Sequence, residues 1–256
     1  MKRLLLSLLM LVSIKSFGCS CGIIPFLNKY QSSDFIATAK ILKVTQDPKN
    51  QDYHDIEIKL IEVYKGNLIT KLKLNSALNT SCSFLTPEDT TWLIFASKGA
   101  NGVLSFGYCS GSQQIDRQFD LVQFPGLDTK YRKSIDLKLE ALSYLKRNKI
   151  STVNEFELTT NDYSICHDGL EGFRTSNRFA VYELNVNQDL TIDKIRVLQE
   201  FDNKELSKKL TNCLQNNVKI YVKSMKTIPE KTRLIVMYFY YPAEGKDQSF
   251  ITTWDI

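Results

Sequence analysis

The first half of the chain contains five short segments in which apolar and polar positions partly alternate, a pattern that predicts β-strands. The two longest are 35–44, with the sequence FIATAKILKV, and 55–63, with the sequence DIEIKLIEV. Shorter segments of the same kind follow at 69–74, 91–96 and 103–108. Five strands separated by turn signals, such as Lys65, Gly66 and Asn67, predict a small closed barrel or a sandwich.

The pattern changes over 131–148, where apolar residues recur at helical spacing and charged residues occupy the other faces. This predicts a helix that packs on the barrel. An α+β pattern follows, with predicted strands at 179–186, 191–198, 217–222, 233–240 and 250–254 and a predicted helix at 204–216. The sequence therefore predicts a mainly β first domain over 19–149 and a small antiparallel α+β domain over 150–256.

The first 18 residues have the pattern of a secretory signal peptide. They combine a basic start, an apolar run over 4–14, and small residues at Ser16 and Gly18. The apolar run is too short for a transmembrane helix, which needs about 20 residues. We therefore expect a secreted or periplasmic chain that begins at Cys19 and has no transmembrane segment.

A lipoprotein is the alternative, with an acylated Cys19 as a tether to the outer envelope. Two observations favour simple cleavage. Phe17 is bulky and Ser16 is not aliphatic, so the residues before Cys19 depart from a lipobox. Acylation would also leave an odd number of cysteines for disulfides.

The net charge of the mature chain, without the signal peptide, is small and does not indicate a partner. The chain has 33 Lys and Arg against 28 Asp and Glu, a net charge of +5. The signal segment contains Lys2, Arg3 and Lys15 and no acid, so the mature chain has 30 against 28, or +2. This removes the reason to expect a nucleic-acid partner.

The sequence contains no motif that points to an intrinsic cofactor or metal site. It has two histidines, His54 and His167, which are too few for a His-rich metal site. Phosphate-binding, dinucleotide-binding and zinc-peptidase motifs are absent from the sequence. We therefore expect no cofactor and no intrinsic metal.

Cysteine is the most informative residue type. All six cysteines follow the signal segment, and an even number in an exported chain predicts three disulfides. They are Cys19, Cys21, Cys82 and Cys109 in the first half, and Cys166 and Cys213 in the second. The four cysteines of the first half allow three pairings, among which the sequence alone does not choose.

The cysteines are also compatible with two other roles. Cys166 precedes His167, but adjacent residues need not have the geometry of a nucleophile and its base, so a disulfide to Cys213 is favoured. Cys19 and Cys21 could form a redox dithiol, which makes a thiol-redox enzyme a remote third function. Their position at the expected mature start and the two later cysteines favour structural bridges.

Several short motifs of the first half occur in a recognisable order. They are Cys19, Ser20, Cys21; Ser33, Asp34, Phe35; Val63, Tyr64, Lys65, Gly66; Ser81, Cys82; Trp92, Leu93, Ile94, Phe95, Ala96; and Tyr108, Cys109, Ser110, Gly111. Together they resemble the netrin-like (NTR) domain of tissue inhibitors of metalloproteinases, over about residues 19–147. The resemblance implies a five-stranded closed barrel of the oligosaccharide/oligonucleotide-binding (OB) type with a C-terminal helix.

The resemblance also implies a pairing and a role for the N-terminal residues. It pairs Cys19 with Cys82 and Cys21 with Cys109. In the inhibitors, the α-amino group and carbonyl of the first cysteine ligate the zinc of a target protease, and the next side chain enters its specificity pocket. These roles fall on Cys19 and Ser20, and the implied partner is a secreted zinc metalloprotease.

The chain also departs from these inhibitors. Animal inhibitors have more disulfides in this domain and a disulfide-rich second domain, and NTR domains also occur as binding modules without a protease target. We therefore expect a non-enzymatic binding protein, secreted or envelope-associated, with metalloprotease inhibition as its more specific form. A lipoprotein binding module without inhibitory activity is the alternative.

Residues 170–256 have a more limited similarity to the C-terminal domain of TonB-type energy transducers. The shared order is a hairpin of two strands followed by the helix at 204–216. The glycine usual in the hairpin turn is absent, since Asp189 is followed by Leu190. We transfer no function on this similarity.

Overall fold

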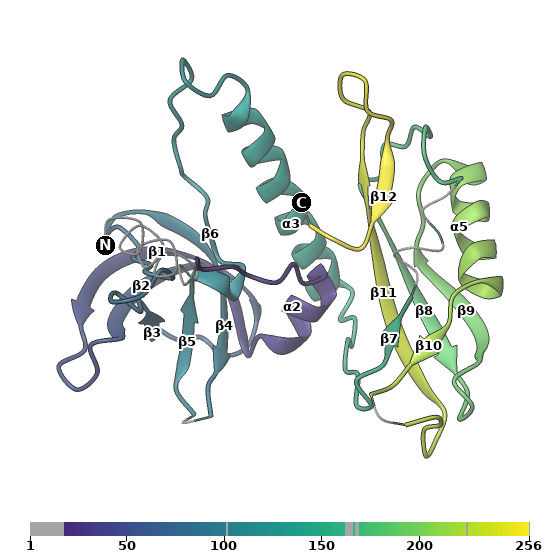
Figure 1. Cartoon of the computed structure of the whole chain (residues 1–256), viewed down its shortest axis with the longest axis horizontal. Helices are drawn as coiled ribbons and strands as arrows, with labels where there is room; N and C mark the ends of the chain where they lie inside the picture. The colour runs from purple at the N-terminus through teal and green to yellow at the C-terminus, as the bar shows by residue number, and fades with distance from the viewer. Residues whose placement is uncertain (1–17, 101, 162–165, 167–168, 224, 256) are drawn as a thin grey trace, which may run out of the picture. The chain divides into compact units, whose positions relative to one another are not determined.

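The computed structural model describes residues 18–100, 102–161, 166, 169–223 and 225–255 (Figure 1). The expected signal peptide lies outside the described residues apart from Gly18. The contacts divide the chain into two compact units, which are described separately. Unit 1 contains the residues up to Gly22 together with Asp34–Asp116, and unit 2 contains Ile23–Ser33 together with Arg117–Ile256.

Unit 1 is a closed five-stranded barrel of the OB type. Its elements are β1 (Phe35–Gln46), β2 (Tyr53–Lys65), β3 (Lys71–Asn75), β4 (Thr91–Lys98), β5 (Leu104–Gly107), the short 3-10 helix η1 (Tyr108–Ser110) and β6 (Gln113–Gln114). The strand order is β1-β2-β3-β5-β4, and β1 pairs with both β2 and β4, which closes the barrel. Strands β3 and β5 are parallel, and the other pairs are antiparallel.

The alternation in the sequence explains the core of the barrel. In β2, Ile56 and Ile58 are buried, whereas Asp55 is exposed and Glu57 is partly exposed. Strand β1 has register shifts against β2, including one between Ile41 and Lys43. Irregularities of this kind increase local twist and curvature, so one strand can pair on both sides and close the barrel.

Unit 2 is an antiparallel α+β unit. Its helices are α2 (Phe26–Ser32), α3 (Leu127–Arg147) and α5 (Lys204–Asn216). Its strands are β7 (Thr159–Thr160), β8 (Phe179–Val186), β9 (Ile192–Gln199), β10 (Ile220–Tyr221), β11 (Thr232–Tyr241) and β12 (Phe250–Thr252). The main sheet has the order β12-β11-β8-β9, and β7 pairs with β10 in a separate two-stranded sheet.

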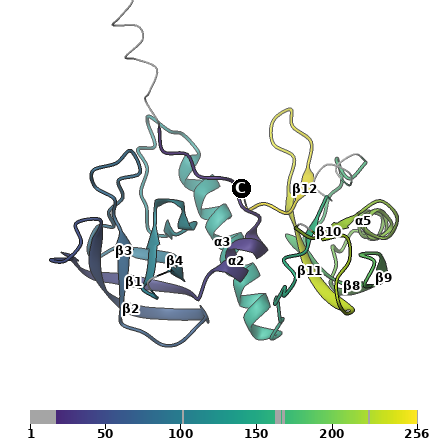
Figure 2. The ribbon, with the colours of Figure 1, turned by 60° about the horizontal axis from the view of Figure 1, so that its bottom comes forward.

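Helices cover both faces of the main sheet (Figures 1 and 2). On one face, Leu206, Leu210 and Leu214 of α5 are buried with Tyr182 and Leu184 of β8. On the other face, helices α2 and α3 contribute aromatic contacts: Phe26 to Phe239 with ring centroids 5.2 Å apart, and Tyr144 to Phe179 at 5.5 Å. Because successive side chains of β8 and β11 point to opposite faces of the sheet, each face has its own apolar layer.

Two features differ from the sequence-based description. The helix predicted over 131–148 begins at Leu127, and the contacts group it with unit 2, whose longer segment begins at Arg117. The physical reason lies in contacts such as that of Tyr144, whose hydroxyl donates to the carbonyl of Leu198 at 2.9 Å. The segment before β1, for which the sequence predicts no element, contains helix α2.

In the hairpin between β8 and β9, a leucine occupies the position where glycine is usual. Leu190 occupies the turn with φ of 66°, a left-handed conformation that favours glycine. The turn is held by hydrogen bonds from the Leu190 amide to the carbonyl of Asn187 and from the Thr191 amide to the Asp189 carboxylate. None of the described helices is both long enough and apolar enough to cross a membrane.

Candidate functional site at the N-terminal edge of the barrel

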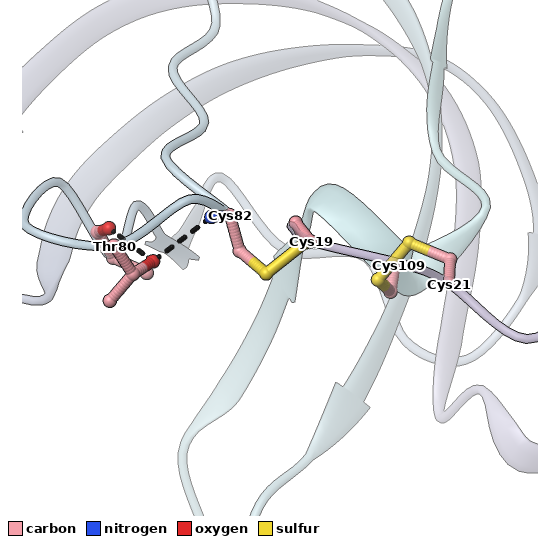
Figure 3. The surroundings of a disulfide bond; sticks show 6 residues. Cys19, Cys21, Thr80, Cys82 and Cys109 are labelled. Atoms are coloured by element: carbon pink, nitrogen blue, oxygen red, sulfur yellow. Dashed lines mark hydrogen bonds between the residues drawn. A yellow bond between two sulfur atoms is a disulfide. The ribbon is translucent and has the colours of Figure 1, made fainter. Parts of the chain in front are cut away.

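Two disulfides join the residues at the start of the described chain to the barrel (Figure 3). Cys19 is bonded to Cys82 with a Cα–Cα distance of 5.0 Å, and Cys21 to Cys109 with 5.3 Å. These are the pairs that the NTR resemblance implies. Because the two bridges leave from alternate residues, they fix the segment at two points on either side of Ser20.

The first anchor, Cys82, lies in the loop between β3 and β4. The hydroxyl of Thr80 accepts the Cys82 amide at 3.1 Å and donates to the carbonyl of Ala77 at 2.8 Å (Figure 3). Ala77 has φ of 43°. These local bonds hold the backbone at Cys82 in one conformation.

A buried histidine supports the base of the same loop. His54 Nδ1 lies 2.9 Å from the hydroxyl of Ser76, and that hydroxyl donates to the carbonyl of Asp52 at 3.0 Å. The Ser76 hydroxyl therefore accepts from His54, which places the proton on Nδ1. The geometry assigns His54 to the support of the loop.

Phe84 connects the two anchors. Its ring lies 6.4 Å from that of Phe106 and 5.6 Å from that of Trp92, both of which belong to the barrel core. It also lies 6.2 Å from the ring of Tyr108, the residue before Cys109. The loop that holds Cys82 and the turn that holds Cys109 are thus packed against one aromatic side chain.

The edge combines a fixed backbone with exposed side chains. Ser20 and Cys21 are exposed, and Cys19 is partly buried. Exposed apolar side chains occur on the two anchoring segments of unit 1: Leu78 and Leu85 in the β3–β4 loop, and Tyr108 in η1. Exposed apolar side chains that gather on one part of a surface are typical of protein-binding sites.

The sulfur atoms at this edge are close together, since Sγ of Cys19, Cys21 and Cys109 all lie within 4.8 Å of one another. Metal binding and nucleophilic attack both require a thiolate. In this oxidised form, all three sulfurs are in disulfides. The cluster therefore presents no thiolate, and its chemistry here is that of a structural clamp.

The third disulfide is separate from this edge. Cys166 is bonded to Cys213 of α5 with a Cα–Cα distance of 5.8 Å, so its sulfur is not a nucleophile in this form. His167, the neighbour considered as its base, lies outside the described residues. Disulfides of this number are typical of proteins that fold in an oxidising compartment.

The bonded cysteines were predictable from the sequence, whereas the residues that support them were not. His54, Ser76 and Phe84 carry no local signal, because their roles depend on contacts with residues distant in sequence. Comparison with models of known protein families finds no match, and a search of curated proteins finds no significant match either.

Proposed function

We propose that the chain is an exported, non-enzymatic binding protein whose binding surface is the N-terminal edge of the barrel, and that it inhibits a secreted zinc metalloprotease. The observation that supports this is the pair of disulfides at the start of the described chain. Disulfides at Cys19 and Cys21 hold the exposed Ser20 between them. A segment fixed in this way loses little conformational entropy when it binds.

The chemistry of the first mature residue gives the proposed mechanism. Export removes residues 1–18, and Cys19 then carries a free α-amino group beside its own carbonyl. A catalytic zinc keeps one coordination position for water. The amine and the carbonyl oxygen replace that water as a chelate, and the Ser20 side chain occupies the adjacent specificity pocket of the protease.

This mechanism requires the amine in its neutral form. An α-amino group has an ordinary pKa near 8, and coordination to Zn²⁺ favours the unprotonated state. Inhibition should therefore strengthen as the pH rises from about 6 to about 8, once the intrinsic pH dependence of the protease is subtracted.

The test is inhibition of a panel of metzincin endopeptidases, measured with a fluorogenic peptide. One additional Ala before Cys19 should abolish inhibition, because the amine would move away from the carbonyl chelate. The matched control carries the additional Ala after Ile256, and Ser20→Ala should retain the chelate but change the ranking of the proteases. Undiminished inhibition by the N-terminally extended chain would overturn the chelate.

Intact-mass measurement of the exported chain distinguishes the proposed inhibitor from the alternative, a lipoprotein binding module. A mass that begins at an unmodified Cys19 supports the inhibitor. An added diacylglyceryl group and acyl chain support the envelope tether, because an acylated amine does not ligate zinc. Free-thiol labelling of the same sample tests the clamp, since reactive Cys19 and Cys21 would favour the redox alternative.

A further inference from the structure

Unit 2 contains a fixed arginine pair on the sheet face that α2 and α3 partly cover. The carboxylate of Glu183 on β8 accepts from Nε of Arg196 at 3.0 Å and from its Nη2 at 2.9 Å. The Glu183 side chain is only 10% exposed, whereas that of Arg196 is 58% exposed. The buried carboxylate therefore orients the guanidinium while leaving much of it open to solvent, and it raises the pKa of Arg196.

The register of the sheet places a second arginine beside the first. Glu183 is paired with Arg196 of β9, and Asn185, two residues further along the same face of β8, is paired with Arg233 of β11. Nη1 of Arg233 lies 3.6 Å from the same Glu183 carboxylate, and its side chain is 55% exposed. One carboxylate thus holds two exposed guanidinium groups.

These groups line a cavity of about 330 Å³ whose wall also contains residues from the end of α3 and the turn after it. The wall includes Tyr144, Lys149 and Ile150. Three cationic side chains, Lys149, Arg196 and Arg233, line the cavity together with one carboxylate. A second cavity of about 430 Å³ shares Arg233, and in it Lys231 is offset by Asp193, 4.0 Å away. The excess positive charge favours an anionic ligand.

The backbone at Lys149 is a second, independent observation. The Ile150 amide donates to the carbonyl of Leu145 at 3.0 Å, and the Lys149 amide donates to that of Lys146 at 3.1 Å. This is the Schellman motif, whose central position is usually glycine. Here that position is Lys149, with φ of 50°. A strained non-glycine residue whose cationic side chain lines a cavity suggests selection for binding over stability.

We propose that Lys149, Arg196 and Arg233 form a binding site for an oxyanion ligand, one that carries a carboxylate or a phosphate group. Guanidinium groups bind either group through paired N–H donors, and an ammonium adds a flexible third donor. Tyr144, Ile150 and Ile235 provide apolar surface for the rest of a small ligand. The site lies entirely within unit 2 and does not depend on the role proposed for Cys19.

The test uses the full mature chain and two probes, inorganic phosphate and citrate, titrated calorimetrically at constant ionic strength. We expect saturable binding of at least one probe, and the stronger probe identifies the chemical source of the oxyanion. Arg233→Gln should weaken binding at least tenfold. Arg196 is left unchanged because its removal would strand the buried Glu183 carboxylate.

Lys149→Gly is the decisive variant. It relieves the left-handed strain and so should raise the melting temperature of the free protein, yet it should weaken probe binding at least fivefold. A purely structural role predicts no loss of binding. The matched control is Lys208→Gln on the exposed face of α5, which removes one positive charge and should leave affinity within twofold. The proposal is overturned if neither probe binds, or if Arg233→Gln and Lys149→Gly bind as tightly as the control.

Discussion

At the scale of single residues, Gly66 shows how one backbone position constrains the barrel. It directly follows β2 with φ of 90°, and a Cβ there would lie 2.5 Å from the carbonyl oxygen of Asp34. The residue that leads into β1 and the end of β2 therefore approach too closely for a side chain. This accounts physically for the glycine that ends the Val63, Tyr64, Lys65, Gly66 motif.

We predict that Gly66→Ala destabilises the barrel by about 1 to 3 kcal/mol, since a left-handed φ and a backbone clash act together. Gly102→Ala is the matched control: Gly102 has φ of 73° but no atom within 4 Å of its Cβ position. It should show only the smaller conformational cost, about 1 kcal/mol. Urea unfolding in a Trp254→Phe background measures both, because Trp92 then reports on the barrel alone. Equal losses in the two variants would contradict the clash.

At the scale of elements, α5 illustrates a helix whose start is encoded locally. Its N-cap, Asn203, accepts the amide of Leu206 at 3.0 Å through its side-chain oxygen. The apolar stripe of Leu206, Leu210 and Leu214 then faces the sheet. The predicted range, 204–216, coincides with the observed helix because cap and stripe agree.

Removal of this cap should weaken unit 2. We predict that Asn203→Ala lowers the free energy of unfolding by about 1 kcal/mol more than Asn203→Ser does, since serine retains an acceptor for the Leu206 amide. Both variants lose the donation from Asn203 Nδ2 to the carbonyl of Arg174, so the comparison isolates the cap. Trp254 fluorescence in a Trp92→Phe background monitors the unfolding of unit 2. It gives the difference in the free energy of unfolding between the two variants. Serine and alanine variants of equal stability would show that the cap contributes nothing.

Helix α2, unlike α5, has no local signal in the sequence that predicts it. Its first residue follows Pro25, and no side chain caps it. It has seven residues, too few to be stable alone. Its stability comes from tertiary contacts such as that of Phe26 with Phe239 of β11. The barrel strands were predictable from alternation, whereas α2 and the assignment of α3 to unit 2 depend on packing between distant segments.

In the candidate sites, too, some residues were predictable from the sequence, and others depend on packing between distant segments. The cysteines were visible because an even number of them in an exported chain predicts disulfides. Ser20 was singled out only through the resemblance to the NTR domain, and its role stays a prediction. The support by His54 and Phe84, and the cavity around Lys149, were not visible, because they arise from strand register and loop packing. Nothing in the local sequence marks Glu183 as the residue that orients two arginines.

At the scale of the whole molecule, three distant segments of the chain meet in one buried ion network. Lys29 Nζ of α2 lies 2.8 Å from the carboxylate of Asp255, and Lys138 Nζ of α3 lies 3.7 Å from it. The side chains of Lys138 and Asp255 are each 4% exposed. The N-terminal helix, the central helix and the last described residues therefore share one carboxylate, and unit 2 is not contiguous in sequence.

We predict that Asp255→Asn destabilises unit 2 by about 3 kcal/mol, because it leaves two cations without their carboxylate in a buried site. The matched control, Glu244→Gln, breaks the exposed pair with Lys130, in which both side chains are more than 60% exposed, and should cost less than about 0.5 kcal/mol. Adding Lys138→Met to Asp255→Asn should recover at least half of the loss, since it removes the buried uncompensated charge. Trp254 fluorescence in a Trp92→Phe background monitors the unfolding of unit 2 in all three variants and gives their free energies of unfolding.

The pH dependence of the same variant provides a separate check. Burial lowers the pKa of Lys138, and Asp255 partly opposes that shift. Without Asp255 the pKa falls further, so the folded state binds fewer protons than the unfolded state between the folded and unfolded pKa values. Stability of Asp255→Asn relative to the parent should then rise as the pH increases from 7 towards 10. A destabilisation that stays constant over this range would mean that Lys138 keeps its proton and that the loss arises from hydrogen bonding alone.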